Sequence, residues 1–308
     1  MSLLTKRETL VQNITYMAIM AAVNAIFSLI AALVPVISLL LMIVLPLSSA
    51  IVFLFCRHRY YVIYAVATAA ICLVVTLFDV SFTVFYVLPS LLTGYLFGLL
   101  IKYKLHAIWI ILITSITQGL FSALTIPLID VLFQVDVIMT FKTILQVGTS
   151  PNINLIIPTF LFFLALVQMV FSYIVIYFEI NKFGYEINDS PLNTGLYSLI
   201  LLGILLLIIP LGFLLPSGAY LFLAGSFYFM FFIVFAHIAS KGRKVLIALG
   251  VSLLAFMFLF AFSYPLLGDP YGLLLMGILP LLIALVSLVN KLLFMRGHKD
   301  KIKGTGKE

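Results

Sequence analysis

The chain of 308 residues is poor in charge, in cysteine and in tryptophan. Charged residues make up 9% of it and hydrophobic residues 65%, whereas soluble domains are roughly 25% charged and less than half apolar. This composition excludes an ordinary soluble domain, even within the loops. The two cysteines are Cys56, beside a basic loop, and Cys72, inside an apolar run. Their positions predict neither a disulfide nor a thiolate metal site.

Motifs that indicate an enzyme or a nucleotide-binding protein are also lacking. The tail ends in GTGKE at residues 304–308, which lacks the GxxxxGK[ST] spacing of a phosphate-binding loop. The chain has no HExxH motif, no paired intramembrane carboxylates and no convincing Ser-His-Asp order. We therefore expect no enzymatic activity, no catalytic residue, no metal and no cofactor.

Long uncharged runs are abundant, and the first of them sets the pattern. Residues 9–34 follow Lys6 and Arg7 and carry no charge, which is enough for one helix across a hydrocarbon layer of about 30 Å. Small residues four apart in such a helix allow a second helix to approach closely. The run contains Ala18, Ala21, Ala22 and Ala25, together with the polar residues Asn24 and Ser28.

Similar long, uncharged, apolar runs recur along the sequence. They predict an all-α, polytopic integral membrane protein, a helical bundle of about ten (eight to ten) transmembrane helices. Tight junctions at Pro35, Asp79 and Pro216 would also permit a re-entrant pair in place of two spans. The predicted spans are 12–33, 36–56, 60–78, 82–101, 106–128, 154–178, 195–215, 219–239, 244–264 and 271–294.

The basic residues predict the orientation of the spans. With the N-terminus inside, sixteen of the 17 lysines and arginines fall in inner segments, and Lys142 falls in an outer one. Because cytoplasmic loops are enriched in Lys and Arg, both termini are predicted to be cytoplasmic. The net charge of +7 is then a topology signal, and no nucleic-acid partner is expected.

A polar inner segment at residues 179–194 divides the spans into two groups. We expect a six-helix membrane domain at 1–182, a four-helix membrane extension at 183–294 and a basic cytoplasmic tail at 295–308, near anionic lipid. The outer connection 129–153 is long but too apolar to be simply disordered. We interpret it as a lid.

The fifth span has the most informative polar side chains. Thr114, Gln118 and Ser122 recur every four residues and therefore share one helix face. Exposure of this stripe to lipid would be costly, so it should face protein or a wet cavity. Interhelical packing and the wall of a ligand cavity both remain open.

Two carboxylates at the outer ends of spans extend the candidate ligand site. Asp79 ends the third span near Tyr86, and Asp130 ends the fifth. Each carboxylate is consistent with a solvated turn residue. Each is also consistent with a position at the rim of an outward-facing pocket, where it would attract a cation or a ligand rich in hydrogen-bond donors. His237, near the inner surface, is more typical of a satisfied histidine than of a proton relay.

Several of these residues resemble a known family. A basic N-terminus, the alanine-rich stretch from Ala18 to Ala22, and Gly94-Tyr-Leu-Phe-Gly98 followed by lysines resemble the substrate-binding S components of energy-coupling-factor (ECF) transporters. The resemblance covers residues 1–180. The chain as a whole resembles the YybS-like predicted membrane proteins of low-GC Gram-positive bacteria. The four extra spans at 195–294 depart from standard S components.

The resemblance implies a docking role for the first helix. In S components an AxxxA pattern there contacts a transmembrane coupling protein, which works with two cytoplasmic ATPases. Carried over, Ala18 and Ala22 would make that contact, with Ala25 as a further candidate. Gly94 and Gly98 form a GxxxG pair, which is typical of close helix contact.

Three functions remain open at this point. The first is a substrate-binding, S-component-like subunit in a bacterial plasma membrane, for uptake of a small metabolite and without an ATPase of its own. The second is a non-transporting membrane scaffold of cell-envelope growth or division. The third is a self-contained secondary transporter or lipid flippase, although no convincing charge at mid-membrane supports ion coupling.

Overall fold

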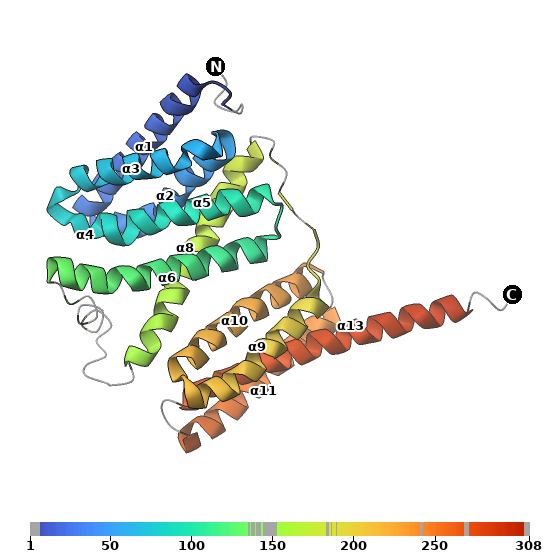
Figure 1. Ribbon diagram of the computed structural model, residues 1–308. Helices are drawn as coiled ribbons and strands as arrows, with labels where there is room; N and C mark the ends of the chain where they lie inside the picture. Colours follow the sequence, from blue (N-terminus) through green and yellow to red (C-terminus); the bar gives the residue numbers. More distant parts are fainter. Residues whose placement is uncertain are drawn as a thin grey trace. The chain divides into compact units, whose positions relative to one another are not determined.

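The computed structural model describes residues 7–134, 136, 139, 143, 153–182, 185, 187, 188, 190–240, 243–267 and 271–304, and throughout these residues the regular elements are helices (Figure 1). Eight of them are long and apolar enough to cross a membrane. Two shorter apolar helices, Ile43–Phe55 and Leu88–Lys102, accompany them. The predicted class, a multi-pass helical membrane protein, is confirmed. The count of about ten spans and the cytoplasmic termini stay predictions, and the predicted lid at 129–153 lies largely outside the described residues.

The chain divides into two compact units. The first comprises Met1–Ser150 and Phe160–Ser190, and the second comprises Pro151–Thr159 and Pro191–Glu308. The predicted domain limits of 1–182, 183–294 and 295–308 stay a prediction.

Six long helices build the first unit: α1 (Leu10–Leu33), α2 (Pro35–Phe55), α3 (Tyr61–Val75), α5 (Leu88–Lys102), α6 (Ala107–Phe133) and most of α8 (Ile153–Lys182). Helix α2 packs against both α1 and α5, and α6 packs against α5 (Figure 1). These contacts place α2 and α5 at the centre of the described part of the unit.

The shorter elements of the first unit lie between its long helices. They are η1 (His58–Tyr60), η2 (Leu77–Asp79), α4 (Val80–Phe82) and the π-helical η3 (Thr83–Val87). Helical structure therefore continues from Val80 to Lys102 through a π turn, a feature that is frequent at functional sites. Beside this turn, the hydroxyls of Thr76 and Thr83 lie 2.6 Å apart.

A hydrogen-bonded junction holds the start of α1 against the end of α2. Thr9 and Gln12 form a capping box that satisfies N–H groups left free at the first turn of α1. Asn13, fully buried, donates to the Arg7 carbonyl at 3.2 Å and accepts from the Arg57 backbone N–H at 2.8 Å. The chain before α1 is therefore fixed to the turn between α2 and α3.

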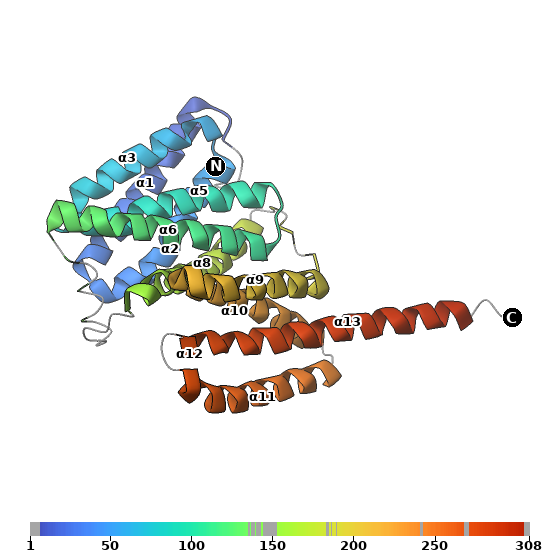
Figure 2. The ribbon, with the colours of Figure 1, turned by 60° about the horizontal axis from the view of Figure 1, so that its bottom comes forward.

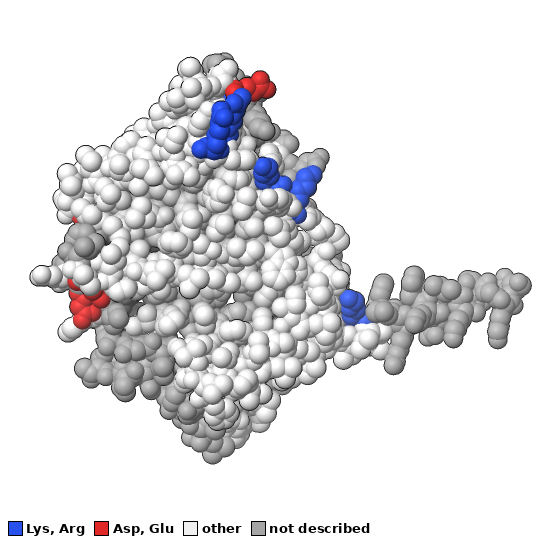
Figure 3. Space-filling model, viewed as in Figure 1, with Lys and Arg blue, Asp and Glu red and all other residues white. Residues whose placement is uncertain are grey.

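The same end of the first unit carries its described basic residues. Lys102 Nζ lies 2.6 Å from His58 Nε2, and the side chain of Asn188 donates to the Lys104 carbonyl at 2.9 Å. These contacts bring together the segments that follow α2, α5 and α8. Figure 3 shows Lys and Arg side chains gathered there, as alternating spans with positive inner loops require.

The second unit contains α9 (Thr194–Leu214), α10 (Pro216–Ala239), α11 (Arg243–Leu267), α12 (Tyr271–Leu274), η4 (Leu275–Gly277) and α13 (Ile278–Gly304). Helix α9 packs against α10 and α13, and α11 packs against α13 (Figure 2). His237 of α10 is buried, and its Nε2 lies 3.0 Å from the hydroxyl of Ser287 on α13. This contact agrees with the interpretation of His237 as a satisfied histidine.

Candidate functional site

A group of buried neutral side chains joins helices of the first unit at the level of Asn24, near the middle of α1. Asn24 of α1 donates to the Tyr64 hydroxyl of α3 at 3.1 Å and accepts from the Ser48 hydroxyl of α2 at 2.7 Å. Asn24 follows the first residue of α1 by about 21 Å at 1.5 Å per residue, which is close to the middle of a span. Three helices are therefore joined at mid-depth by one amide.

A second pair continues this arrangement into α5 and α6. The Thr93 hydroxyl of α5 donates to the Gln118 side-chain oxygen of α6 at 3.3 Å, and Gln118 is 2% exposed. The residue after Thr93 is Gly94, where an added Cβ would lie 2.5 Å from the Pro46 carbonyl oxygen of α2. The α2–α5 contact thus links the group of three and the Thr93–Gln118 pair into one set. We name it the mid-depth layer, and its members are Asn24, Ser48, Tyr64, Thr93 and Gln118.

The chemistry of the mid-depth layer is that of uncharged hydrogen bonding. None of its five side chains carries a charge at neutral pH, because the phenol of tyrosine ionises near pH 10. Such groups can hold helices together, or they can bind the amide, hydroxyl or ring nitrogen groups of an uncharged ligand. The five groups include no carboxylate, imidazole, thiol or ammonium group.

The polar stripe of α6 faces the interior, as the cost of exposing it to lipid predicts. Two of its hydroxyls bond to carbonyls of their own helix: Thr114 donates to Ile110 at 2.7 Å and Thr125 to Ser122 at 2.9 Å. The Ser115 hydroxyl has no hydrogen-bond partner among the described residues. The buried members of the stripe are Thr114, Ser115, Gln118, Ser122 and Thr125.

The predicted outer carboxylates have separate surroundings. Asp79 is the N-cap of α4 and accepts from the Phe82 backbone N–H at 3.3 Å. Tyr86 is half-buried, and its ring packs against that of Phe82 with centroids 4.8 Å apart. Asp130 is half-buried near the end of α6. A helix cap is thus one local role for Asp79, and the ligand roles of Asp79, Tyr86 and Asp130 stay predictions.

The alanines of α1 lie on two different faces. Ala18 and Ala22 are exposed, whereas Ala21 and Ala25 are buried at 4% and 7% exposure. Larger exposed residues flank the exposed pair, namely Ile14, Ile19 and Ile26. The exposed face of α1 therefore carries two small side chains, Ala18 and Ala22, between larger ones, and we name this pair the notch; Ala25 packs within the unit. The docking roles of all three stay predictions.

Gly94 and Gly98 lie where α5 contacts α2. At Gly98 an added Cβ would come within 2.6 Å of the Phe53 ring. Real Cβ atoms essentially never make contacts this short, so any side chain at Gly94 or Gly98 would push α5 away from α2. The two glycines thereby set the separation of the helices that carry Ser48 and Thr93.

Both thiols are buried and unpaired with each other. Cys56, in the turn after α2, is 2% exposed, and burial raises the pKa of its thiol from 9.0 to about 11, against the opposing effect of the Arg7 guanidinium. Cys72 is fully buried and lies 3.5 Å from the Ser28 hydroxyl. Within the described ranges no group of three His, Cys, Asp or Glu side chains could hold a metal ion.

Sequence reasoning identified Gln118 and Asn24 but missed their partners Ser48, Tyr64 and Thr93. A signal for them was present, because each is a polar residue in the interior of an apolar helix and must find a hydrogen-bond partner there. The sequence did not give the helix pairing, and without it no partner could be assigned.

No family model, no curated protein and no solved structure matches this chain. The resemblance to S components therefore depends on the residues that carry it, which are Ala18, Ala22, Gly94 and Gly98.

Proposed function

We propose that this multi-pass membrane protein is the substrate-binding, S-component-like subunit of an uptake system for a small polar metabolite, without an ATPase of its own. It would act in a bacterial plasma membrane with both termini in the cytoplasm. Energy would come from cytoplasmic ATPases through a transmembrane coupling protein.

The exposed notch on α1 is the observation that carries this proposal. Ala18 and Ala22 are four residues apart and exposed, so they suit contact with a helix of another protein, whereas Ala21 and Ala25 are buried. A helix that served only as a membrane anchor would gain nothing from small residues on its outer face.

The mid-depth layer supports the second half of the proposal. Its neutral donors and acceptors match an uncharged, hydrogen-bonding metabolite, and they lie on five helices that could separate slightly to admit one. Gln118 would be the central ligand residue. Its two-ended amide can donate and accept at the same time.

The docking role of α1 is tested by filling the notch with larger side chains. Ala18→Leu together with Ala22→Leu should abolish co-purification of a coupling protein and ATPases with the tagged full-length chain, identified by mass spectrometry after mild cross-linking. Ala123→Leu on the exposed face of α6 is the matched control and should leave the complex intact. Retention of the same partners by the double variant would refute the docking role of α1.

The ligand-binding role of the layer is tested with the purified chain against pools of vitamins and nucleobases. Gln118→Leu should reduce binding of any ligand found by at least tenfold, because a buried hydrogen-bonding site that loses its partner leaves ligand groups unsatisfied. The Ala18→Leu and Ala22→Leu double variant should bind that ligand normally, since the notch is not part of the layer.

One observation favours a scaffold as the second candidate. Asn24, Ser48 and Tyr64 bond to one another, as do Thr93 and Gln118, so the layer is already used in packing. A scaffold of envelope growth or division would then use the notch and the basic end to bind partners. In that case Gln118→Leu would leave partner binding unchanged, and no ligand would be found.

A further inference from the structure

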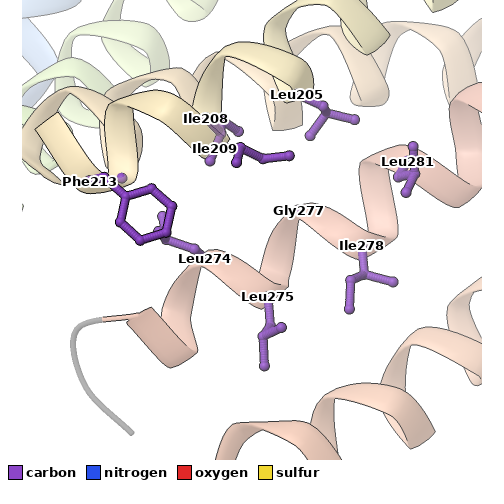
Figure 4. A pocket seen from close by; sticks show the side chains of 10 residues that line it. Leu205, Ile208, Ile209, Phe213, Leu274, Leu275, Gly277, Ile278 and Leu281 are labelled. Carbon is purple, nitrogen blue, oxygen red and sulfur yellow. The ribbon is translucent and has the colours of Figure 1, made fainter. Parts of the chain in front are cut away.

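Two hollows lie along the seam between α9 and α13 of the second unit. One, of about 500 Å³, is lined by leucines and by Asn193, Gly195 and Lys291. The other, of about 430 Å³, is lined by aliphatic and aromatic side chains and two glycines, with Leu205 and Leu281 at the end nearer the first hollow (Figure 4). Both volumes are within the range of roughly 300–1,000 Å³ typical of small-molecule sites.

Lys291 gives the first hollow a positive charge. Its Nζ donates to the Asn193 side-chain oxygen at 3.0 Å, and an added Cβ at Gly195 would collide with the lysine side chain. The lysine is thus held by a neutral amide and by the absence of a side chain at position 195. No ion pair joins it to a carboxylate in the part of the chain that the structure describes. Its ammonium group lines the hollow, where it can contact an anion.

The depth of the two hollows matches that of a membrane lipid. The apolar segment Leu275–Leu293 ends just beyond Lys291, so this lysine lies near the end of the hydrocarbon region. Leu281 precedes it by about 15 Å along α13 at 1.5 Å per residue. This is about one leaflet, half of a hydrocarbon layer of roughly 30 Å. A lipid acyl chain that starts at the level of Lys291 would end at the rim of the second hollow.

We propose that the α9–α13 seam binds an anionic glycerophospholipid. Its phosphate contacts the Lys291 ammonium and the Asn193 amide, and one acyl chain lies over Leu196, Leu199 and Leu288 toward Leu281. Charge complementarity selects an anionic headgroup over a zwitterionic one, and the leucine lining selects a hydrocarbon chain over a free anion. This site is separate from the proposed ligand layer and does not depend on it.

A tryptophan placed in the seam tests the proposal. The chain has one native tryptophan, Trp109, so Trp109→Phe with Leu199→Trp leaves a single reporter in the first hollow. The full-length protein is reconstituted in phosphatidylcholine bilayers containing dibrominated phosphatidylglycerol or dibrominated phosphatidylcholine, whose bromines quench tryptophan. Phe235→Trp on α10 is the control reporter, because Phe235 is 60% exposed and Leu199 is 59% exposed.

The Leu199→Trp reporter should favour phosphatidylglycerol over phosphatidylcholine by about fivefold, the effect of one lysine beside an anionic lipid. Lys291→Gln, which keeps a hydrogen-bonding side chain, should bring the ratio to about one, and Lys291→Arg should preserve the preference. The Phe235→Trp reporter should show no preference in any variant.

Three results would overturn the proposal. Equal quenching by the two headgroups with Lys291 present removes the headgroup site. If the Lys291→Gln variant still prefers phosphatidylglycerol, charges other than Lys291 cause the preference. No quenching by either lipid means that protein, a second copy or the rest of this chain, covers the seam. Gel-filtration profiles of each variant that match the parent show that the protein is folded.

Discussion

The Ser48 hydroxyl of α2 donates a hydrogen bond of 2.7 Å to the side-chain oxygen of Asn24 on α1, and both residues are buried. Two consecutive spans are therefore fixed against each other by polar groups inside an otherwise apolar environment. The Asn24 amide nitrogen extends the connection to Tyr64 of α3. These bonds of the mid-depth layer determine how α1, α2 and α3 are aligned.

Removal of either partner should cost a modest amount of stability. Interhelical hydrogen bonds in membranes contribute about 0.6 kcal/mol on average, so Ser48→Ala should lower the free energy of unfolding by about that much. Asn24→Ala breaks two bonds and should cost about 1–2 kcal/mol. Reversible unfolding of the purified chain in mixed micelles measures both.

The double variant Ser48→Ala with Asn24→Ala tests whether these two residues interact directly, as their distance indicates. Because each single change already breaks the Ser48–Asn24 bond, the two losses should add to more than the double variant loses. Strict additivity would contradict a direct bond. Asn290→Ala, at an exposed amide on α13, is the control and should leave stability unchanged.

Two glycine substitutions should change the free energy of unfolding in opposite directions. Gly94→Ala should destabilise the chain by about 1–3 kcal/mol, because the new Cβ overlaps the Pro46 carbonyl and Ser49. Gly203→Ala, in α9, has nothing within 4 Å of the added Cβ and should stabilise by about 0.5–1 kcal/mol through its better helix propensity. Equal effects of the two changes in the same unfolding assay would mean that α2 and α5 are not in close contact.

The sequence predicted the parts of the fold that follow from hydrophobicity. Apolar runs predicted helices, and the energetic cost of polar groups in lipid predicted that Gln118 and its neighbours face inward. Eight helices of the described residues are long and apolar enough to cross a membrane and two apolar helices are shorter, so the predicted count of about ten spans stays a prediction. The π turn at Thr83–Val87 was not predicted, because its one-residue widening leaves the hydrophobic period almost unchanged.

Pairing between helices was beyond what the sequence could predict. Ala21 and Ala22 are adjacent and chemically identical, yet one is buried and the other exposed, since a turn of 3.6 residues places neighbours about 100° apart. The same ambiguity explains why Ala25 was grouped with Ala18 and Ala22 although it packs within the unit. Only the positions of neighbouring helices separate these cases.

The native thiols should be almost unreactive toward maleimide in the folded protein. The thiolate is the reactive species, and the raised pKa of Cys56, about 11, leaves it neutral at pH 8 and still mostly neutral at pH 9. Cys72 is fully buried. Labelling at pH 7, 8 and 9, followed by mass spectrometry, should give little adduct, with two adducts per chain after denaturation in SDS. Fast labelling that grows between pH 7 and 8 would indicate an exposed thiol of ordinary pKa.

Unreactive native thiols permit a direct test of the topology in cells, with one new cysteine at each end of the first unit. Arg59 is exposed beside the basic end, and Asp136 is exposed in the connection after α6. If the positive-inside assignment is correct, Asp136→Cys labels with a membrane-impermeant maleimide on intact cells. Arg59→Cys labels only after permeabilisation, since lysine- and arginine-rich segments stay in the cytoplasm. The parent chain, with its buried thiols, is the background control. The reverse pattern would place residue 136 in the cytosol, and it would remove the outward-facing orientation on which the proposed uptake role of the first unit depends.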